Sequence, residues 1–224
     1  IKLISKGIFW ALSRPDNEIR TMVARRKRKH YYLYIKSRGL AGIYIHIPFC
    51  RQACHYCNFH FSTSLKNSEA MVKAIIKEIG LQKDFLSEPI DSVYFGGGTP
   101  SILNSQSIRS IIQQVRQVIG IKAGAEITLE VNPEDVSLDK AEAWKDCGVN
   151  RVSLGLQTLN NAVLKSLNRA HSSEQGLEAI ELLQKAGLNN ITIDLMYGLP
   201  DRDRTQWQDD LEQEEPSRQA RPRI

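Results

Sequence analysis

The sequence predicts an α/β fold, a partial (β/α) barrel with about five strand–helix units, and three observations support this. Short runs rich in β-branched and aromatic residues alternate with longer stretches of helical period between residues 43 and 211. Strand followed by helix, repeated in this way, implies parallel strands joined by right-handed crossovers. The strands also read as continuous apolar runs, which indicates a sheet covered on both faces. Because a closed barrel needs eight such units, we expect this barrel to be incomplete.

The first unit consists of a strand at Ile43–Ile47, ended by Pro48, and a helix from Ser68 to about Leu86. Ser68 is the expected N-cap, because its side-chain oxygen can accept a hydrogen bond from the first helical turn. The loop between strand and helix carries three of the four cysteines within residues 50–57. Apolar residues at helical spacing predict the buried face of the helix, namely Met71, Ile75, Ile79 and Leu86.

The second and third units follow the same order. A strand at Asp91–Phe95 is broken by the glycines of GGGTPS (residues 96–101), and a helix is expected over Ser105–Val118. The next strand covers Glu126–Val131 and is stopped by Asn132 and Pro133, after which Ser137 or Asp139 opens a helix that Gly148 closes. The buried face of the helix over residues 105–118 is predicted to be Ile108, Ile111, Ile112, Val115 and Ile119.

The fourth unit has a strand at Arg151–Leu156 and a helix from Ser172 or Ser173 to Lys185, with Gly187 in the C-cap region. The fifth has a strand at Asn190–Met196, the loop of residues 197–200, and a helix over about 205–211. Residues 212–224 show no apolar periodicity. We therefore expect an unstructured or out-of-frame tail that adds no sixth strand and leaves one sheet edge unprotected.

Composition and charge separate residues 1–40 from the rest. These 40 residues hold 11 Lys and Arg against 2 Asp and Glu, whereas residues 41–224 hold 19 against 23. The basic pI of about 9.0 therefore comes from the leader, and it does not argue for nucleic-acid binding by the folded part. The basic run of residues 24–30 fits a nucleic-acid or membrane-surface patch, and an acid-poor leader fits a transit peptide. A disordered or foreign leader is the interpretation we favour.

The remaining totals bound the class of protein. With 224 residues and 42% hydrophobic content, the chain can form one sizeable domain, here residues 41–211. No run of about 18 apolar residues exists, so no membrane span is expected. Cysteines clustered this tightly do not resemble a disulfide framework, and they favour metal binding in a reducing compartment, the cytoplasm.

Unusual residues follow the predicted strands at their carboxyl ends. They are the cysteine loop, the GGG run, Glu130, Gln157 and Asp194. Because the carboxyl ends of parallel strands meet at one rim, we expect the site to be built there. A single residue of this kind is explained by an ordinary buried hydrogen bond, but five at one rim indicate function.

The three clustered cysteines, Cys50, Cys54 and Cys57, have the spacing Cys-x3-Cys-x2-Cys. A four-iron cluster normally takes four cysteines, so three leave one iron open for a reactive ligand. A zinc site with three cysteines and one of the three neighbouring histidines is the alternative, although this spacing is unusual for zinc. The GGGTP run lacks the Gly-Lys-Ser/Thr ending of a phosphate loop, which disfavours a nucleotide triphosphate site. The fourth cysteine, Cys147, is expected to be a buried structural thiol.

Six motifs occur in order along residues 41–211: YIHIPFC, GGGTPS, LEVNPE, SLGLQ, LNRAH and DLMYGLP. Together with the cysteine spacing, they resemble the radical S-adenosylmethionine (SAM) superfamily. Within it, they are similar to the branch of oxygen-independent coproporphyrinogen III oxidases (HemN) and haem chaperones (HemW). The resemblance implies a partial barrel of the radical SAM type, with residues 41–211 as its core.

The resemblance also implies the role of each cofactor-binding residue. Cys50, Cys54 and Cys57 would hold a [4Fe–4S] cluster, and its open iron would bind the amino and carboxylate groups of SAM. Two tyrosines would lie near the cluster, one of them against the adenine, and glycines would let the backbone approach the methionine amino group. Rim residues would meet the ribose and other polar groups of SAM, and an arginine fork would bind its carboxylate. The SAM-site residues so implied are Tyr44, Tyr56, Gly97, Gly98, Thr99, Glu130, Gln157, Arg169 and Asp194.

One position separates the two kinds of relative. HemN-type oxidases add a fourth cysteine two residues after the third, and here that place holds Phe59. The resemblance therefore favours a HemW-type haem chaperone, present as a C-terminally truncated fragment, and leaves open whether it is an enzyme. The alternatives are an oxidase-like oxidoreductase of porphyrin biosynthesis and a non-catalytic metal-binding module or inactive fragment. The implied partners are haem (in the full-length parent) or a porphyrin, a haem-acceptor protein, and an electron donor such as flavodoxin or ferredoxin.

Overall fold

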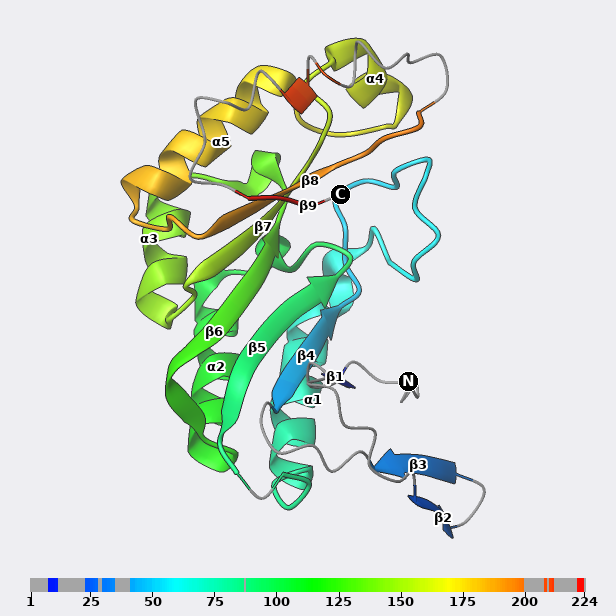
Figure 1. Ribbon diagram of the computed structural model, residues 1–224, viewed down its shortest axis with the longest axis vertical. Helices are drawn as coiled ribbons and strands as arrows, with labels where there is room; N and C mark the ends of the chain where they lie inside the picture. The colour runs from blue at the N-terminus through cyan, green and yellow to red at the C-terminus, as the bar shows by residue number, and fades with distance from the viewer. Residues whose placement is uncertain are drawn as a thin grey trace.

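A central sheet organises the computed structural model shown in Figure 1, which describes residues 8–11, 23–27, 30–34, 41–86, 88–199, 208, 210–211 and 221–223. The sheet has seven strands in the order β1-β4-β5-β6-β7-β8-β9. Its five middle strands are parallel and follow chain order. They are β4 (Gly42–Ile47), β5 (Ile90–Gly97), β6 (Ile121–Val131), β7 (Arg151–Gln157) and β8 (Ile191–Leu195). The predicted α/β fold with five parallel strands in an open barrel is confirmed.

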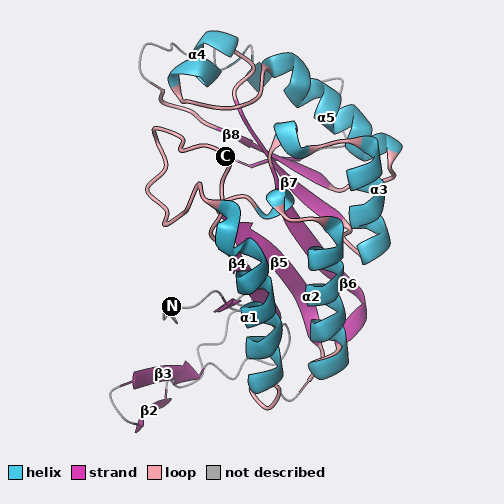
Figure 2. Ribbon diagram, turned by 180° about the vertical axis from the view of Figure 1, so that it is seen from behind, coloured by secondary structure: helices cyan, strands magenta, loops and turns pink. Residues whose placement is uncertain are grey.

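Four longer helices cover one face of this sheet, as the front and back views in Figures 1 and 2 show. They are α1 (Ser68–Leu81), α2 (Ser105–Val118), α3 (Leu138–Cys147) and α5 (Ser173–Lys185). A short helix, α4 (Asn161–Ser166), lies in the connection between β7 and α5, and the sequence pattern missed it. Single turns of 3-10 helix occur at η1 (Leu65–Asn67), η2 (Pro100–Ile102) and η3 (Pro133–Asp135).

The expectation that both faces of the sheet are covered is wrong for β4. In β4, Ile43, Ile45 and Ile47 are buried, whereas Tyr44 and His46 between them are only half-buried. The apolar side chains pack against the helices, and the polar and aromatic ones point to the opposite, inner face. An incomplete barrel has no helix layer on its inner face, so this face is available for a site.

Helix boundaries agree with the capping chemistry at most ends. Helix α2 has the predicted bounds, and Ser137 and Ser172 accept the N-cap hydrogen bonds of α3 and α5. Ser68, however, is not an N-cap. It is the first residue of α1, and its hydroxyl donates to the Leu65 carbonyl because a 3-10 turn leads into the helix.

The lengths of three elements differ from expectation. Helix α1 ends at Leu81 rather than near Leu86, because the Gln82 amide closes a tight last turn on two carbonyls. Strand β6 begins five residues earlier than expected, at Ile121. The glycines do not break β5, because Gly96 and Gly97 still pair with β4. Side-chain preference alone cannot reveal such pairing, since the hydrogen bonds belong to the backbone.

The chain ends add strands to both edges of the parallel sheet. Strand β1 (Ile8–Ala11) pairs antiparallel with β4, and β9 (Arg221–Arg223) pairs parallel with β8. Strands β2 (Val23–Lys27) and β3 (His30–Tyr34) form a separate hairpin. The prediction that the tail adds no strand is therefore wrong, since backbone pairing needs no apolar period. The division into leader, core and tail stays a prediction, and the expected helix at 205–211 falls largely outside the described residues.

The described core is continuous across the helix-covered face. Trp144, Phe95 and the isoleucines of α1, α2 and β4 are its largest fully buried side chains. Cys147 belongs to this core, as expected for a structural thiol. Among the residues described, we find no helix with the length and apolar character that crossing a bilayer requires.

Candidate functional site

The cysteine loop leaves the carboxyl end of β4 and returns to it. The amide of Cys50 donates to the Ser62 carbonyl at 3.1 Å, and the Ser62 amide donates to the Pro48 carbonyl at 2.9 Å. Inside the loop, the Cys57 amide donates to the Cys54 carbonyl at 3.1 Å, which forms a tight turn. The three thiols therefore sit, half-buried, on one closed loop at the predicted rim.

The glycine run after β5 fixes the first half of this loop. The Gly98 amide donates to the Ile47 carbonyl at 2.9 Å, and the Thr99 amide donates to the Phe49 carbonyl at 2.7 Å. The Thr99 hydroxyl lies 3.5 Å from the Cys50 sulfur. A Cβ atom on Gly98 would lie only 2.6 Å from the Phe49 carbonyl oxygen and 2.9 Å from the Cys50 sulfur. Glycine is required here because the two backbones nearly touch.

The segment after α4 fixes the second half of the loop. The His55 amide donates to the Leu167 carbonyl at 3.1 Å, and its ring nitrogen Nδ1 lies 2.9 Å from the Ser166 carbonyl oxygen. Asn168 contacts the same stretch through its side chain. Residues 166–169, which we call the latch, thus hold residues 52–55 from outside.

Arg169, the last residue of the latch, connects the cysteine loop to the ends of β6 and β7. Its Nη2 donates to the Gly155 carbonyl at 2.7 Å and to Asn132 Oδ1 at 2.9 Å. Its Nη1 faces the Tyr56 hydroxyl at 3.4 Å and the Cys54 sulfur at 3.7 Å. Burial raises the pKa of Tyr56 to about 12, although the guanidinium opposes that shift. Arg169 is a buried bridging residue and not a surface arginine.

A buried pair lies behind Arg169. His171 Nε2 is 3.1 Å from the Leu156 carbonyl oxygen, and its Nδ1 is 3.4 Å from Glu134 Oε2. Asn132 Nδ2 donates to the other Glu134 oxygen at 3.3 Å. Burial favours the neutral acid, but hydrogen bonding with His171 and the charge of Arg169 lower the pKa of Glu134 overall. The carboxylate therefore stays charged behind the guanidinium and balances it.

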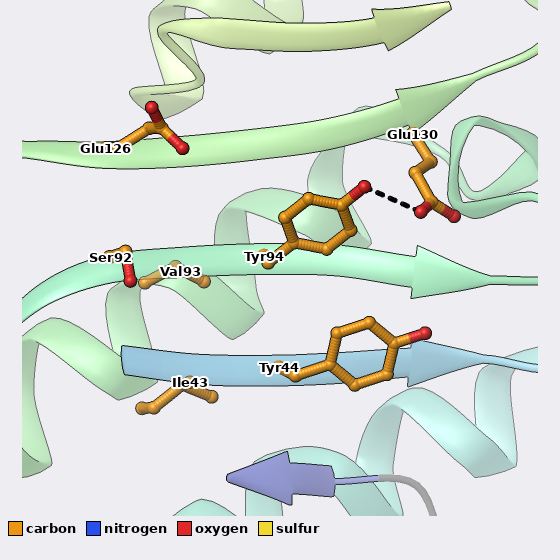
Figure 3. A pocket seen from close by; sticks show the side chains of 7 residues that line it. All are labelled: Ile43, Tyr44, Ser92, Val93, Tyr94, Glu126 and Glu130. Atoms are coloured by element: carbon orange, nitrogen blue, oxygen red, sulfur yellow. Dashed lines mark hydrogen bonds between the residues drawn. The ribbon is translucent and has the colours of Figure 1, made fainter. Parts of the chain in front are cut away.

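The inner face of the sheet has a cavity of about 400 Å³ along β4, β5 and β6 (Figure 3). The rings of Tyr44 and Tyr94 stack there with centroids 5.8 Å apart. Tyr94 donates to Glu130 Oε1 at 2.7 Å, and the Gly97 amide donates to Glu130 Oε2 at 3.1 Å. Burial and the Glu130 charge raise the pKa of Tyr44, so its hydroxyl stays protonated. The cavity opens beside the predicted SAM residues Tyr44 and Glu130, below the rim that carries the cysteines.

The remaining predicted residues line the rim at β7 and β8. Gln157 ends β7 with a left-handed backbone (φ 71°), and its carbonyl accepts from the Met196 amide at 2.9 Å. The Asp194 carboxylate accepts from the Ser153 hydroxyl at 3.3 Å. The structure thus brings Gly98, Thr99 and Arg169 into contact with the cysteine loop, which itself contains Tyr56. Gln157 ends β7, where its side-chain amide and the Arg169 guanidinium both lie beside Gly155, and Asp194 lies on the neighbouring β8.

Sequence reasoning missed the asparagines of the site. Asn132 lies between Arg169, Thr99 and Glu134, and Asn168 contacts the cysteine loop. Both stand inside motifs of the sequence, LEVNPE and LNRAH, in which the pattern predicts only that Asn132 stops a strand and gives Asn168 no role. The signal that distinguishes Asn168 is its left-handed backbone (φ 56°), which the sequence does not display.

The donor set of the loop fits an iron–sulfur cluster. Among the described residues, none of the cysteines forms a disulfide, and burial raises the pKa of Cys50 while Thr99 and Arg169 oppose that shift. Within those same residues, no three His, Cys, Asp or Glu side chains are arranged to share one metal ion. In a cluster each thiolate binds a different iron, so the sulfur atoms need not converge on one point. The glycine junction and Arg169 supply the close backbone approach and the positive charge that suit a thiolate-bound group.

Comparison with known proteins extends this picture. The sequence pattern of the radical SAM superfamily matches residues 44–213. The chain is 38% identical over 170 residues to the heme chaperone HemW of Lactococcus lactis subsp. lactis, covering 75% of this chain and 44% of that protein. It is 35% identical over 164 residues to an oxygen-independent coproporphyrinogen III oxidase of Bradyrhizobium diazoefficiens, covering 71% of this chain and 36% of that protein.

A solved structure agrees with these relatives. Coproporphyrinogen III oxidase (HemN) from Escherichia coli superposes with a TM-score of 0.70 at 29% identity, covering 76% of this chain and 40% of that one. The chain therefore spans less than half the length of these relatives.

Proposed function

Because the chain belongs to the radical SAM superfamily, we propose that it binds a [4Fe–4S] cluster and SAM and acts as a HemW-like haem chaperone. The observation that carries the proposal is the closed loop of Cys50, Cys54 and Cys57, held from both sides at the carboxyl rim of a parallel sheet. The identity to HemW of Lactococcus lactis supports the chaperone part.

Each residue of the site has a place in this proposal. The three cysteines hold the cluster as thiolates, and Tyr56 borders them beside Arg169. When bound, such a cluster supplies one-electron reduction of SAM. Arg169, already bridging to Gly155 and Asn132, would orient its planar fork toward the SAM carboxylate.

The glycines and the inner face have a second task. Gly97, Gly98 and Thr99 bring backbone next to the cysteine loop where a side chain would block the approach of the methionine group. Tyr44 borders the cavity, and Glu130 fixes the end of β5 through the Gly97 amide. Gln157 and Asp194 offer polar groups for the ribose at the ends of β7 and β8.

An oxygen-independent coproporphyrinogen oxidase is the second candidate, and the superposition with HemN of Escherichia coli favours it. Against it stands Phe59, 72% exposed, where the oxidase type has a fourth cysteine. The two candidates share the cofactor site and differ in substrate. Haem binding would support the chaperone, whereas decarboxylation of coproporphyrinogen would support the oxidase.

The proposal extends to partners and location. A flavodoxin- or ferredoxin-type protein would deliver the electron, and a haem-acceptor protein would receive haem. Because the four cysteines of the described chain are unpaired thiols, a reducing compartment such as the cytoplasm suits them.

Anaerobic reconstitution tests the cofactor part. The chain is incubated with iron and sulfide, and iron, sulfide and zinc are then counted. About four irons per chain and a spectral change on adding SAM are expected. The matched control is Cys147→Ser, which removes a thiol outside the loop and should leave iron uptake unchanged, whereas Cys54→Ser should abolish it. Zinc uptake without iron would refute the cluster.

A further inference from the structure

Within the latch, Asn168 makes the shortest side-chain hydrogen bonds to the cysteine loop. The Asn168 Oδ1 accepts from Gln52 Nε2 at 2.6 Å, and the Asn168 carbonyl accepts from the same nitrogen at 2.9 Å. Asn168 Nδ2 donates to the Ala53 carbonyl at 2.7 Å. Both ends of one amide are therefore bound to the two residues that precede Cys54.

The backbone of Asn168 adapts it to this position. Its φ of 56° is left-handed, a conformation that asparagine adopts more readily than most other non-glycine residues. Its own amide donates to the Lys165 carbonyl at 3.1 Å, and the next amide, of Arg169, donates to the Leu164 carbonyl at 2.9 Å. The latch thus follows α4, whose Leu164 is buried, and is hydrogen-bonded to its last turn.

We propose that Asn168 is a positioning residue that holds the cysteine loop in its cluster-binding shape before the cluster arrives. The inference rests on the proposed function. A free loop loses conformational entropy when a ligand orders it, so a loop ordered in advance binds with less loss. Asn168 supplies that order through Gln52 and Ala53, and neighbouring Arg169 then faces the Cys54 sulfur. Helix α4 then has the task of placing Asn168 and Arg169 against the loop.

Two substitutions separate the side chain from the backbone. Asn168→Gly keeps the left-handed conformation and removes the amide. Asn168→Asp keeps the shape and the acceptor but replaces the donor to the Ala53 carbonyl with a carboxylate oxygen. The matched control is Asn104→Asp, at the N-cap of α2, where Oδ1 accepts from the Ser107 amide at 2.7 Å and aspartate caps equally well.

Hydrogen exchange of the cluster-free chain gives the first readout. Peptides covering residues 50–57 should exchange about fivefold to tenfold faster in both Asn168 variants, because one or two hydrogen bonds to the loop are lost. In the Asn168 variants, peptides from α2 should exchange at the parental rate. In the control variant Asn104→Asp, peptides from the loop should do the same. Unchanged loop exchange, or equal acceleration in α2, would overturn the proposal.

Cluster loading gives the second readout. After anaerobic addition of iron and sulfide, the Asn168 variants should take up iron several-fold more slowly, and the electron paramagnetic resonance signal of the reduced cluster should change. If both variants take up iron at the parental rate and give the parental spectrum, the positioning role of Asn168 is refuted and the proposed function is not. Failure of the parent chain to take up iron refutes the proposed function and, with it, the cluster role of Asn168.

Discussion

Replacement of Gly98 by alanine tests the glycine junction most directly. The added Cβ would stand 2.6 Å from the Phe49 carbonyl oxygen, whereas ordinary contact begins at 3.4 Å, so the loop backbone must retreat by about 0.8 Å. That retreat would lengthen the hydrogen bond from the Thr99 amide to the same oxygen, now 2.7 Å, to the limit of hydrogen bonding. Overpacking of this kind costs about 1–3 kcal/mol.

The matched control is Gly80→Ala in helix α1. A Cβ there would meet only Gln114 Nε2, at the ordinary distance of 3.6 Å. Because alanine loses less backbone entropy than glycine in a helix, this variant should gain about 0.5–1 kcal/mol. Replacement of glycine by alanine is therefore expected to lower the free energy of unfolding at position 98 and to raise it at position 80.

Thermal unfolding of the cluster-free chain, followed by circular dichroism, measures both variants. With a shift of about 2–4 °C per kcal/mol for a domain of this size, Gly98→Ala should lower the midpoint by several degrees and Gly80→Ala should raise it slightly. Iron uptake should fall only in Gly98→Ala. A Gly98→Ala chain as stable as the parent, or equal losses in both variants, would refute the reasoning.

Two further predictions concern the frame of the site. Ser172→Ala removes the capping box that Ser172 forms with Gln175, and it should reduce the free energy of unfolding in urea by about 1 kcal/mol, while Ser173→Ala should change it little. Equal effects of the two would contradict the capping assignment. Glu134 has a pKa below its ordinary 4.5 in the folded chain, so its stabilising effect is full above that value and disappears as the pH falls through the folded pKa. Glu134→Gln should therefore be less stable than the parent at neutral pH, with a gap that narrows toward acid. Urea unfolding across this range measures the gap, and a constant gap would contradict the linkage.

The sequence by itself determined the fold class, the bounds of helices α2, α3 and α5, and the rim. These follow from local rules: an apolar period of a helix, a serine or asparagine before its first turn, and the parallel order that gathers all carboxyl strand ends at one edge. The cysteine loop could be recognised for the same reason, since its three cysteines lie within eight residues. The cofactor roles given to the cysteines and to all the SAM-site residues stay predictions.

Only the tertiary structure decided what holds that loop. Asn168 and Ala53 are 115 positions apart, and Arg169 reaches Cys54 across the same separation, so no local pattern records their contact. The same is true of the inner sheet face and of the strands at the two sheet edges, because backbone hydrogen bonds form between segments whatever their side chains. A local sequence pattern encodes the conformation of a segment, whereas the partner that the segment meets depends on the packing of the whole chain.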